Sequence, residues 1–297
     1  MMIRKLPLIV VLAALVITTC RACRPNKPLM GGDITPREAA VITEDDDAAV
    51  PEEGVDSDAP LQDAEEAGER VTPAQLTVVK FSDASGLTPL KRYAYRAWYS
   101  EQLGIPVAVA WYLTDQHTTG SYKRKGISFH EDPEVRNSPT TYDYMQSGYD
   151  RGHMCPSGDN KWNKTAQEQS FLMTNICPQN HNLNTGDWND LEQRCRGWAN
   201  GYGTIYIVCG PILRGTQHKR LKKKVTVPEA FYKVVMRWGD EPAAIGFIYE
   251  NIGTSQPIEE AVRSVDEIEQ LTGIDFFSAL PDDIETRIEA AADLNDW

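Results

Sequence analysis

The chain has 297 residues, of which 41% are hydrophobic, and its formal net charge at pH 7 is −13. This length accommodates one or two domains with a substantial core, and the acidic balance argues against a general affinity for polyanions. Residues 1–70 hold 7 basic and 14 acidic side chains, so the remaining chain carries a net charge of only −6 and is compatible with a local phosphate-binding surface.

The first twenty residues have the pattern of an export signal. Arg4 and Lys5 precede an apolar run over residues 6–17, which is too short to span a bilayer comfortably. An apolar residue three positions before Cys20 resembles the processing box of bacterial lipoproteins, although Thr19 stands where Gly or Ala is usual. We therefore expect export to the bacterial cell envelope with a lipid on Cys20, or alternatively cleavage and release into the periplasm or medium.

Residues 21–70 have the composition of a linker. Acidic side chains are mixed with Ala, Pro and Gly, and aromatic residues are absent from this segment of the sequence. Such a segment buries too little apolar surface to offset its ordering entropy, and its negative charge keeps it extended. We predict a solvated spacer, or alternatively a specific acidic docking segment, and place one folded domain at residues 71–297.

The folded domain begins with two predicted strands. Residues 93–99 and 107–114 are rich in aromatic and apolar side chains and are separated by a turn at residues 104–106. Residues 115–148 are polar and contain several glycines, so we predict mostly loop.

Polar groups suited to phosphodiester chemistry gather between residues 149 and 196. A strand is predicted to end at His153, two residues after Arg151, and helices are predicted around residues 165–173 and 188–199. Histidine can accept a proton from water near neutral pH, and arginine can hold a phosphate through two hydrogen bonds. Glu192 and Arg196 have helical i,i+4 spacing, which places both on one face of the second helix.

The rest of the chain completes an α+β fold. A central strand is expected at residues 204–208, further strands at 231–237 and 243–249, and amphipathic helices at 265–271 and 281–292. Together these elements predict a mixed, mainly antiparallel sheet with packed helices.

Three blocks of sequence carry a resemblance to a known family. They are Asp150-Arg151-Gly152-His153, then Thr174-Asn175-Ile176-Cys177-Pro178-Gln179, and then Leu183-Asn184-Thr185-Gly186-Asp187-Trp188 followed by Glu192 and Arg196. Their order and spacing resemble those of the DNA/RNA non-specific endonucleases, the ββα-metal nucleases. The resemblance extends over roughly residues 90–290 and implies a ββα-metal active-site motif.

The resemblance implies a role for the central residues of each block. His153 would be the general base that takes a proton from the attacking water. Asn184 would bind Mg²⁺ directly, Glu192 would hold waters around the ion, and Mn²⁺ would be able to replace Mg²⁺. Asn175 would orient the histidine or the phosphate, and Arg196 would contact the phosphate or pair with Glu192.

Arg151 and the basic run at residues 214–224 each have two possible roles, and Asp150 has one. Arg151 would bind phosphate or pair with acidic groups of the site, whereas Asp150 would be a structural hydrogen-bond acceptor. The basic run at residues 214–224 would be either the surface that binds the backbone of a duplex or a solvated loop.

One position departs from the family pattern. The family commonly has an arginine five residues before the Asp-Pro pair at residues 132–133, and this chain has Ile127 there. Arg124 is the preferred replacement, ahead of Lys125, because a guanidinium holds two phosphate oxygens together. Alternatively, both are solvated and Arg151 or Arg196 carries the positive charge alone.

Four cysteines lie in the predicted domain, at positions 155, 177, 195 and 209. An exported protein meets an oxidising compartment that favours disulfides, and four cysteines allow three pairings. Cys155 and Cys177 each lie two residues beyond a predicted site residue, so we expect the pairs Cys155–Cys177 and Cys195–Cys209.

The sequence therefore predicts a metal-dependent endonuclease that binds DNA and RNA through the phosphate backbone, without selecting sequence or sugar. A catalytically silent, envelope-anchored binding protein on the same fold is the alternative. An organelle nuclease is disfavoured because a transit peptide would be amphipathic and rich in Arg and Ser. The sequence leaves the oligomeric state and the natural substrate open.

Overall fold

The computed structural model describes residues 71–297, so the predicted export signal, Cys20 and the acidic linker lie outside the described residues. A seven-stranded antiparallel sheet runs through this domain in the order β12-β11-β10-β7-β4-β3-β2. Its strands are β2 (Leu87–Lys91), β3 (Arg96–Ser100), β4 (Ile105–Thr114), β7 (Thr204–Ile212), β10 (Ala230–Arg237), β11 (Ala243–Glu250) and β12 (Val262–Arg263). β7 lies at its centre, as predicted.

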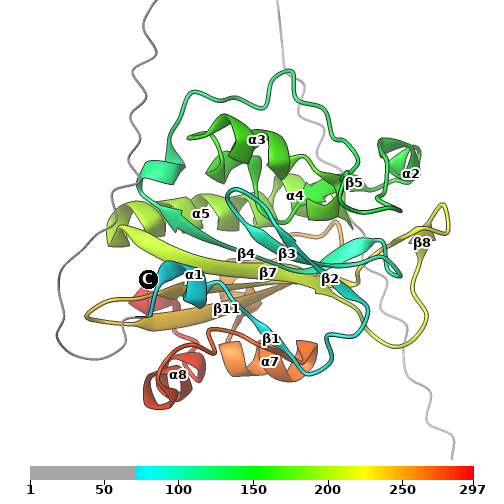
Figure 1. Cartoon of the computed structure of the whole chain (residues 1–297). Helices are drawn as coiled ribbons and strands as arrows, with labels where there is room; N and C mark the ends of the chain where they lie inside the picture. The colour runs from blue at the N-terminus through cyan, green and yellow to red at the C-terminus, as the bar shows by residue number, and fades with distance from the viewer. Residues whose placement is uncertain (1–70) are drawn as a thin grey trace, which may run out of the picture. The chain divides into compact units, whose positions relative to one another are not determined.

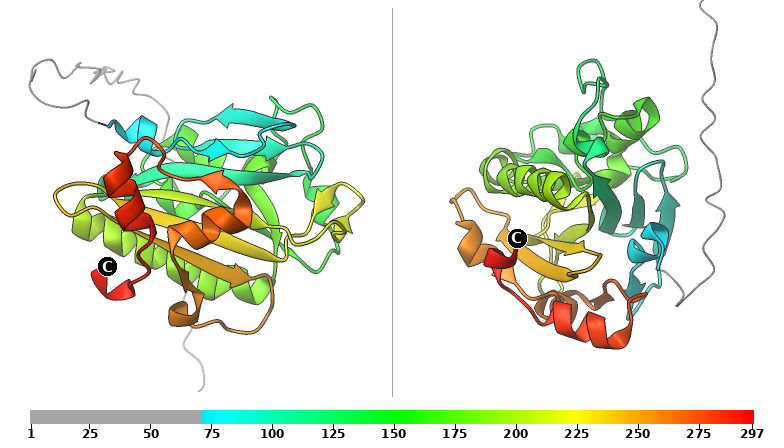
Figure 2. Two further views of the ribbon diagram at one scale, coloured as in Figure 1. Left: turned by 90° about the horizontal axis from the view of Figure 1, so that it is seen from below. Right: turned by 90° about the vertical axis from the view of Figure 1, so that its left-hand side faces the viewer.

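Helices cover both faces of the sheet, which gives the domain three layers (Figure 1). One face carries α3 (Lys164–Ser170), α4 (His181–Thr185) and α5 (Asp187–Tyr202), and the other carries α7 (Val265–Thr272) and α8 (Asp282–Glu289). The side view in Figure 2 separates the green helices of the first layer from the orange and red helices of the last. This arrangement confirms the predicted α+β fold with a mainly antiparallel sheet and packed helices.

The central strand β7 contributes to two hydrophobic cores because successive side chains of a strand point to opposite faces. Ile205 and Ile207 belong to the core under α5, whereas Tyr206 and Val208 belong to the core over α7 and α8. Since both faces are covered, β7 is apolar along nearly its whole length.

α5 turns a narrow apolar face toward the sheet. Trp188, Leu191, Cys195 and Ala199 are its buried residues, spaced by three or four, which is the period of an amphipathic helix. The polar residues beside this face are therefore held at fixed positions along the edge of the first core.

A small antiparallel hairpin lies next to α4 and α5. It consists of β5 (Asp150–His153) and β6 (Ile176–Gln179), and His153 is opposite Ile176. Gly152 is required here, because a Cβ atom at this position would lie 2.2 Å from Oε1 of Gln179. The hairpin followed by the two helices forms the predicted ββα motif.

The sequence missed β2, α4, β12 and other short elements. The others include the helices α1 (Pro73–Leu76), α2 (Thr141–Tyr144) and α6 (Ile258–Ala261), and the strand pairs β1 (Lys80–Phe81) with β13 (Ile274–Asp275) and β8 (Arg220–Leu221) with β9 (Val225–Thr226). The predicted turn at residues 104–106 is also shifted, since Ile105 and Pro106 already belong to β4. Among the helices of residues 71–297, none is long and apolar enough to cross a membrane.

The four cysteines of the domain are buried and free in the structure, so the expected pairs Cys155–Cys177 and Cys195–Cys209 are not formed. All four side chains fill the core between the sheet and its first helical layer. Burial raises the pKa of Cys195 and of Cys209 to about 12. The expectation was based on sequence position alone, whereas core packing decides where these thiols point.

Candidate active site

One cavity of about 780 Å³ brings together all but one of the predicted site residues. It lies between the end of β5, the loop around residues 120–125, the segment 156–161 and the helices α4 and α5. The predicted residues that line it are Arg124, Arg151, His153, Asn184, Glu192 and Arg196. Asn175 is not among its lining residues.

His153 is held at the end of β5 by two aromatic rings. Its imidazole lies edge-on to Phe171, with 5.0 Å between ring centroids, and tilted against Phe129 at 5.2 Å. Burial lowers the pKa of His153 to about 3, and the positive charge of Arg124 adds to this effect. Nε2 has no hydrogen-bond partner among the described residues. The ring is therefore neutral at pH 7 and free to accept a proton.

Asn175 acts on the backbone that follows the histidine. Its Oδ1 accepts a hydrogen bond from the N–H of Cys155 (2.9 Å), and its Nδ2 donates to the carbonyl oxygens of Cys155 (2.9 Å) and Ser170 (2.8 Å). The side chain is fully buried. Any influence of Asn175 on His153 is thus exerted through the main chain, because its amide is committed to these backbone groups.

Asn184 is oriented by Asp150. Nδ2 of Asn184 donates to Oδ2 of Asp150 at 2.9 Å, and Nδ1 of His181 lies 2.8 Å from the same oxygen. Asp150 is therefore a structural hydrogen-bond acceptor, as the sequence predicted. Because the amide nitrogen of Asn184 is committed to Asp150, Oδ1 is the atom left to bind a cation.

Glu192 and Arg196 line the same cavity, but they do not pair with each other. Arg196 donates from Nη1 to Asp159 at 2.7 Å instead of pairing with Glu192, and its predicted contact with the phosphate stays a prediction. Asp159 also accepts from Nε1 of Trp111 at 3.2 Å. Burial raises the pKa of Glu192 to about 7, with Lys233 opposing this shift and Asp159 adding to it.

Two arginines stack on the same aromatic rings that hold the histidine. Arg151 lies 4.8 Å from the centroid of Phe129, and Arg124 lies 5.7 Å from that of Phe171. Neither forms an ion pair with an acidic residue of the described domain. Both guanidinium groups therefore remain available to an anion in the cavity.

The loop that contains Arg124 contributes further positive charge. Lys123, Lys125 and Lys161 also line the cavity, whereas Ile127 does not. Ile127 therefore contributes nothing to the cavity, whereas Arg124 and Lys125, three and two residues upstream, do line it.

Two buried charged residues that interact with the predicted site residues Glu192 and Arg196 were not predicted from the sequence. Lys233 lies fully buried in β10, with Nζ 4.4 Å from the ring centroid of Trp188 and 5.5 Å from that of Trp111. Asp159 is the partner of Arg196, in a segment that carries no obvious signal of its own. Lys233 did have a signal in the sequence, because a single cation interrupts an otherwise apolar strand.

The basic run at residues 214–224 is separate from the cavity lining. Arg214 forms two hydrogen bonds with Glu250, of 2.6 and 2.7 Å. Arg220 and Lys224 donate to backbone carbonyl groups of their own chain. Several of these cationic side chains therefore bind groups of the protein itself. The role of the basic run as a surface for the backbone of a duplex stays a prediction.

Comparisons with known proteins agree with this geometry. The family model for DNA/RNA non-specific endonucleases matches residues 72–283. Nuclease EXOG, mitochondrial, of Xenopus laevis is 35% identical over 62% of this chain and 57% of that protein, so this chain spans little more than half of its relative's length. A nuclease of Nostoc sp. is 32% identical over 75% of this chain and 88% of that protein.

A solved structure shares the fold. A chain in the crystal structure of the EndoG/EndoGI complex aligns with a TM-score of 0.62 at 23% identity. The alignment covers 65% of this chain and 86% of that chain.

Proposed function

The chain belongs to the DNA/RNA non-specific endonuclease family, and on this premise we propose that it is a metal-dependent endonuclease that hydrolyses phosphodiester bonds in DNA and RNA. One observation carries the proposal. The neutral His153, with Nε2 lacking a partner within residues 71–297, lines a cavity together with Asn184, Glu192 and several cations.

His153 is proposed as the general base. A neutral imidazole can take a proton from a water that attacks phosphorus. Its low pKa makes it a weak base on its own, but a phosphate beside the ring favours the imidazolium form and raises the pKa. Substrate binding would therefore bring the base closer to the pH at which it works.

Asn184 and Glu192 fit a hard divalent cation, and we propose Mg²⁺ with Mn²⁺ as a substitute. Amide and carboxylate oxygens are the ligands that Mg²⁺ prefers, and Asp150 already fixes the amide of Asn184 so that Oδ1 is free. When bound, the ion would supply charge neutralisation at the phosphate and the leaving oxygen.

Arg124 and Arg151 would bind the non-bridging oxygens of the phosphate, on which negative charge grows during attack. Both are already held by the aromatic rings beside His153, so little ordering is required. Contacts of this kind reach the backbone rather than the base edges, which supports tolerance of sequence and sugar.

The test is digestion of plasmid DNA and of single-stranded RNA by the purified full chain, with Mg²⁺ and with EDTA. We expect both substrates to be cleaved internally with Mg²⁺ and neither with EDTA. Binding of both nucleic acids without cleavage, under all metal conditions, would instead identify a catalytically silent binding protein.

Export and attachment to the cell envelope belong to the same proposal. A lipid on Cys20 would place the full-length protein in the detergent phase after phase separation, and Cys20→Ser should move it to the aqueous phase. Recovery of the unaltered protein in the aqueous phase would mean a freely released enzyme.

A further inference from the structure

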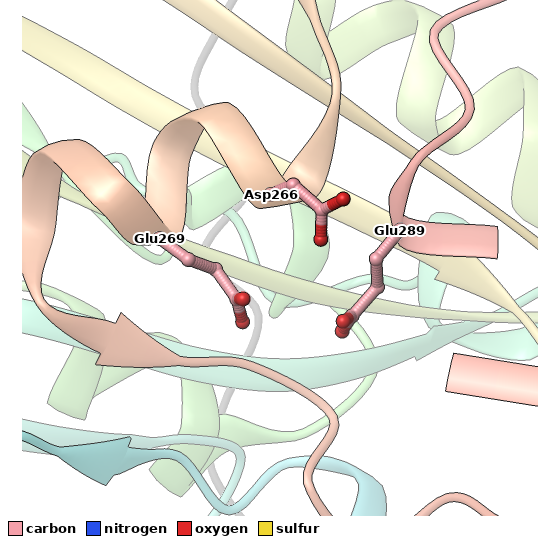
Figure 3. Close-up of side chains that lie close together, drawn as sticks. All are labelled: Asp266, Glu269 and Glu289. Atoms are coloured by element: carbon pink, nitrogen blue, oxygen red, sulfur yellow. The ribbon is translucent and has the colours of Figure 1, made fainter. Parts of the chain in front are cut away.

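The helices α7 and α8 bring together three carboxylate side chains outside the candidate active site (Figure 3). Asp266 and Glu269 lie on α7, and Glu289 is the last residue of α8. One carboxylate oxygen of each residue lies within 4.8 Å of the others. Figure 3 shows the three side chains directed into a common space between the two helices.

Glu289 distinguishes this group from an ordinary acidic surface. Its side chain is only 5% exposed, and Oε1 has no hydrogen-bond partner among the described residues. A buried polar atom without a partner costs free energy, and a buried charge costs more. Oε1 of Glu289 is therefore the oxygen of this group that gains most from a bound ligand.

The described chain supplies no cation to this group. Asp266, Glu269 and Glu289 are absent from every ion pair of residues 71–297. Lys80 on the neighbouring strand β1 pairs with Asp275 at 3.7 Å instead. The backbone N–H of Phe276 donates to Oε1 of Glu269 (2.7 Å), but this neutral donor does not balance three carboxylates.

We propose that Asp266, Glu269 and Glu289 form a Ca²⁺ site that joins α7 to the end of α8. Three carboxylates offer hard oxygen ligands, which suit Ca²⁺ and Mg²⁺. Ca²⁺ accepts six to eight oxygen ligands in a flexible geometry, whereas Mg²⁺ demands a near-ideal octahedron. Three side chains from two separate helices therefore suit Ca²⁺ better.

The site is expected to stabilise the fold rather than take part in cleavage. Asp266 and Glu269 are three residues apart, so both project from the same face of α7 toward the end of α8. A cation held between the two helices would tie the C-terminal part of the chain to the sheet. Figure 1 shows α7 and α8 on the other face of the sheet from β5, α4 and α5, the elements that contribute residues to the cavity.

The test uses the full chain with Asn184→Ala, which removes the proposed Mg²⁺ ligand, after treatment with a chelator. Calcium chloride alone is then titrated, with isothermal titration calorimetry for stoichiometry and scanning calorimetry for Tm. We expect one bound Ca²⁺ and a rise in Tm of roughly 5–10 °C when free Ca²⁺ exceeds Kd about 100-fold.

Variants in this background separate the proposed site from other acidic groups. Glu289→Gln and Glu269→Gln should each remove most of the rise in Tm. Glu285→Gln is the matched control, because it makes the same change one turn earlier on α8 and should keep the rise. With Asn184 intact, Glu289→Gln should leave Mg²⁺-dependent cleavage unchanged.

Two results would overturn the proposal. One is a Tm that does not respond to Ca²⁺ in the Asn184→Ala protein. The other is an undiminished response in both Glu289→Gln and Glu269→Gln, which would place the bound ion elsewhere on the molecule.

Discussion

Buried carboxylates lie on both faces of the seven-stranded sheet, and the two faces compensate their charge differently. In the candidate active site Asp159 has Arg196 at 2.7 Å, and Glu192 has the buried cation Lys233 to oppose its protonation. Between α7 and α8, burial and then the repulsion of neighbouring acids, Glu269 first, raise the pKa of Glu289 to about 9. The first face is ready for an anionic substrate, whereas the second lacks a positive charge.

The largest expected effect is loss of catalysis on the first face. His153→Ala should lower kcat by at least ~10²-fold with the fold intact, because no other described group in the cavity is a neutral base. Asn184→Ala should have a similar effect through loss of the cation ligand. Initial rates on plasmid DNA, with circular dichroism to check the fold, provide the measurement. Near-parental activity in either variant would mean that the site is wrongly assigned.

Removing Arg196 tests whether its positive charge compensates the buried carboxylate of Asp159. Arg196→Ala leaves a buried carboxylate without its partner, which costs about 3–5 kcal/mol in comparable buried pairs. We expect a much lower urea midpoint than in the parent protein. Asp159→Asn with Arg196→Ala should recover part of the loss, since the charge is then removed together with its partner. A small change in the single variant would show that water already compensates Asp159.

Arg124 is expected to act on the rate more than on binding. If its charge stabilises the transition state, Arg124→Ala should lower kcat by about 10–10²-fold and change KM less. Lys125→Ala is the neighbouring control and should have a smaller effect. Unchanged kinetics in both variants would return this role to Arg151.

The carboxyl group of Glu289, between α7 and α8, should make the free energy of unfolding fall as pH rises, which is the opposite of the effect of a carboxylate in an ordinary ion pair. Folding raises the pKa of Glu289 above its usual 4.5, with Glu269, Glu285, Asp266 and Asp275 as the neighbouring acids. Its contribution to stability is therefore present below pH 4.5 and is lost as pH rises through about 9.

Glu289→Gln should remove this dependence. With chelator at pH 8, we expect the variant to be more stable than the parent by roughly 1–3 kcal/mol, the usual cost of a buried group without a partner. Denaturation by urea at several pH values measures the difference. Parallel pH profiles for the two proteins would contradict the assignment of the effect to Glu289.

Local features of the site were predictable from the sequence. The common face of Glu192 and Arg196 follows from helical spacing, and the strand predicted to end at His153 is observed as β5. The partner of Arg196 was not predictable, because Asp159 lies 37 residues earlier and reaches it only through the fold.

The errors share the same cause. Cys155 and Cys177 were paired from their positions in the sequence, although the core decides their orientation. The helix that carries Asn184, α4, was not predicted, because an element of this length is too short to show a periodic pattern. The acidic group between α7 and α8 combines residues from two helices, so helix periodicity alone could not reveal it.

Asn175 has a consequence for the conditions under which the site keeps its shape. Its amide fastens the backbone at Cys155 to Ser170 through three hydrogen bonds, in a place where a disulfide had been expected. A carboxamide is indifferent to thiol reductants, unlike a cystine. The segment after His153 should therefore hold its geometry equally well in a reducing and in an oxidising compartment.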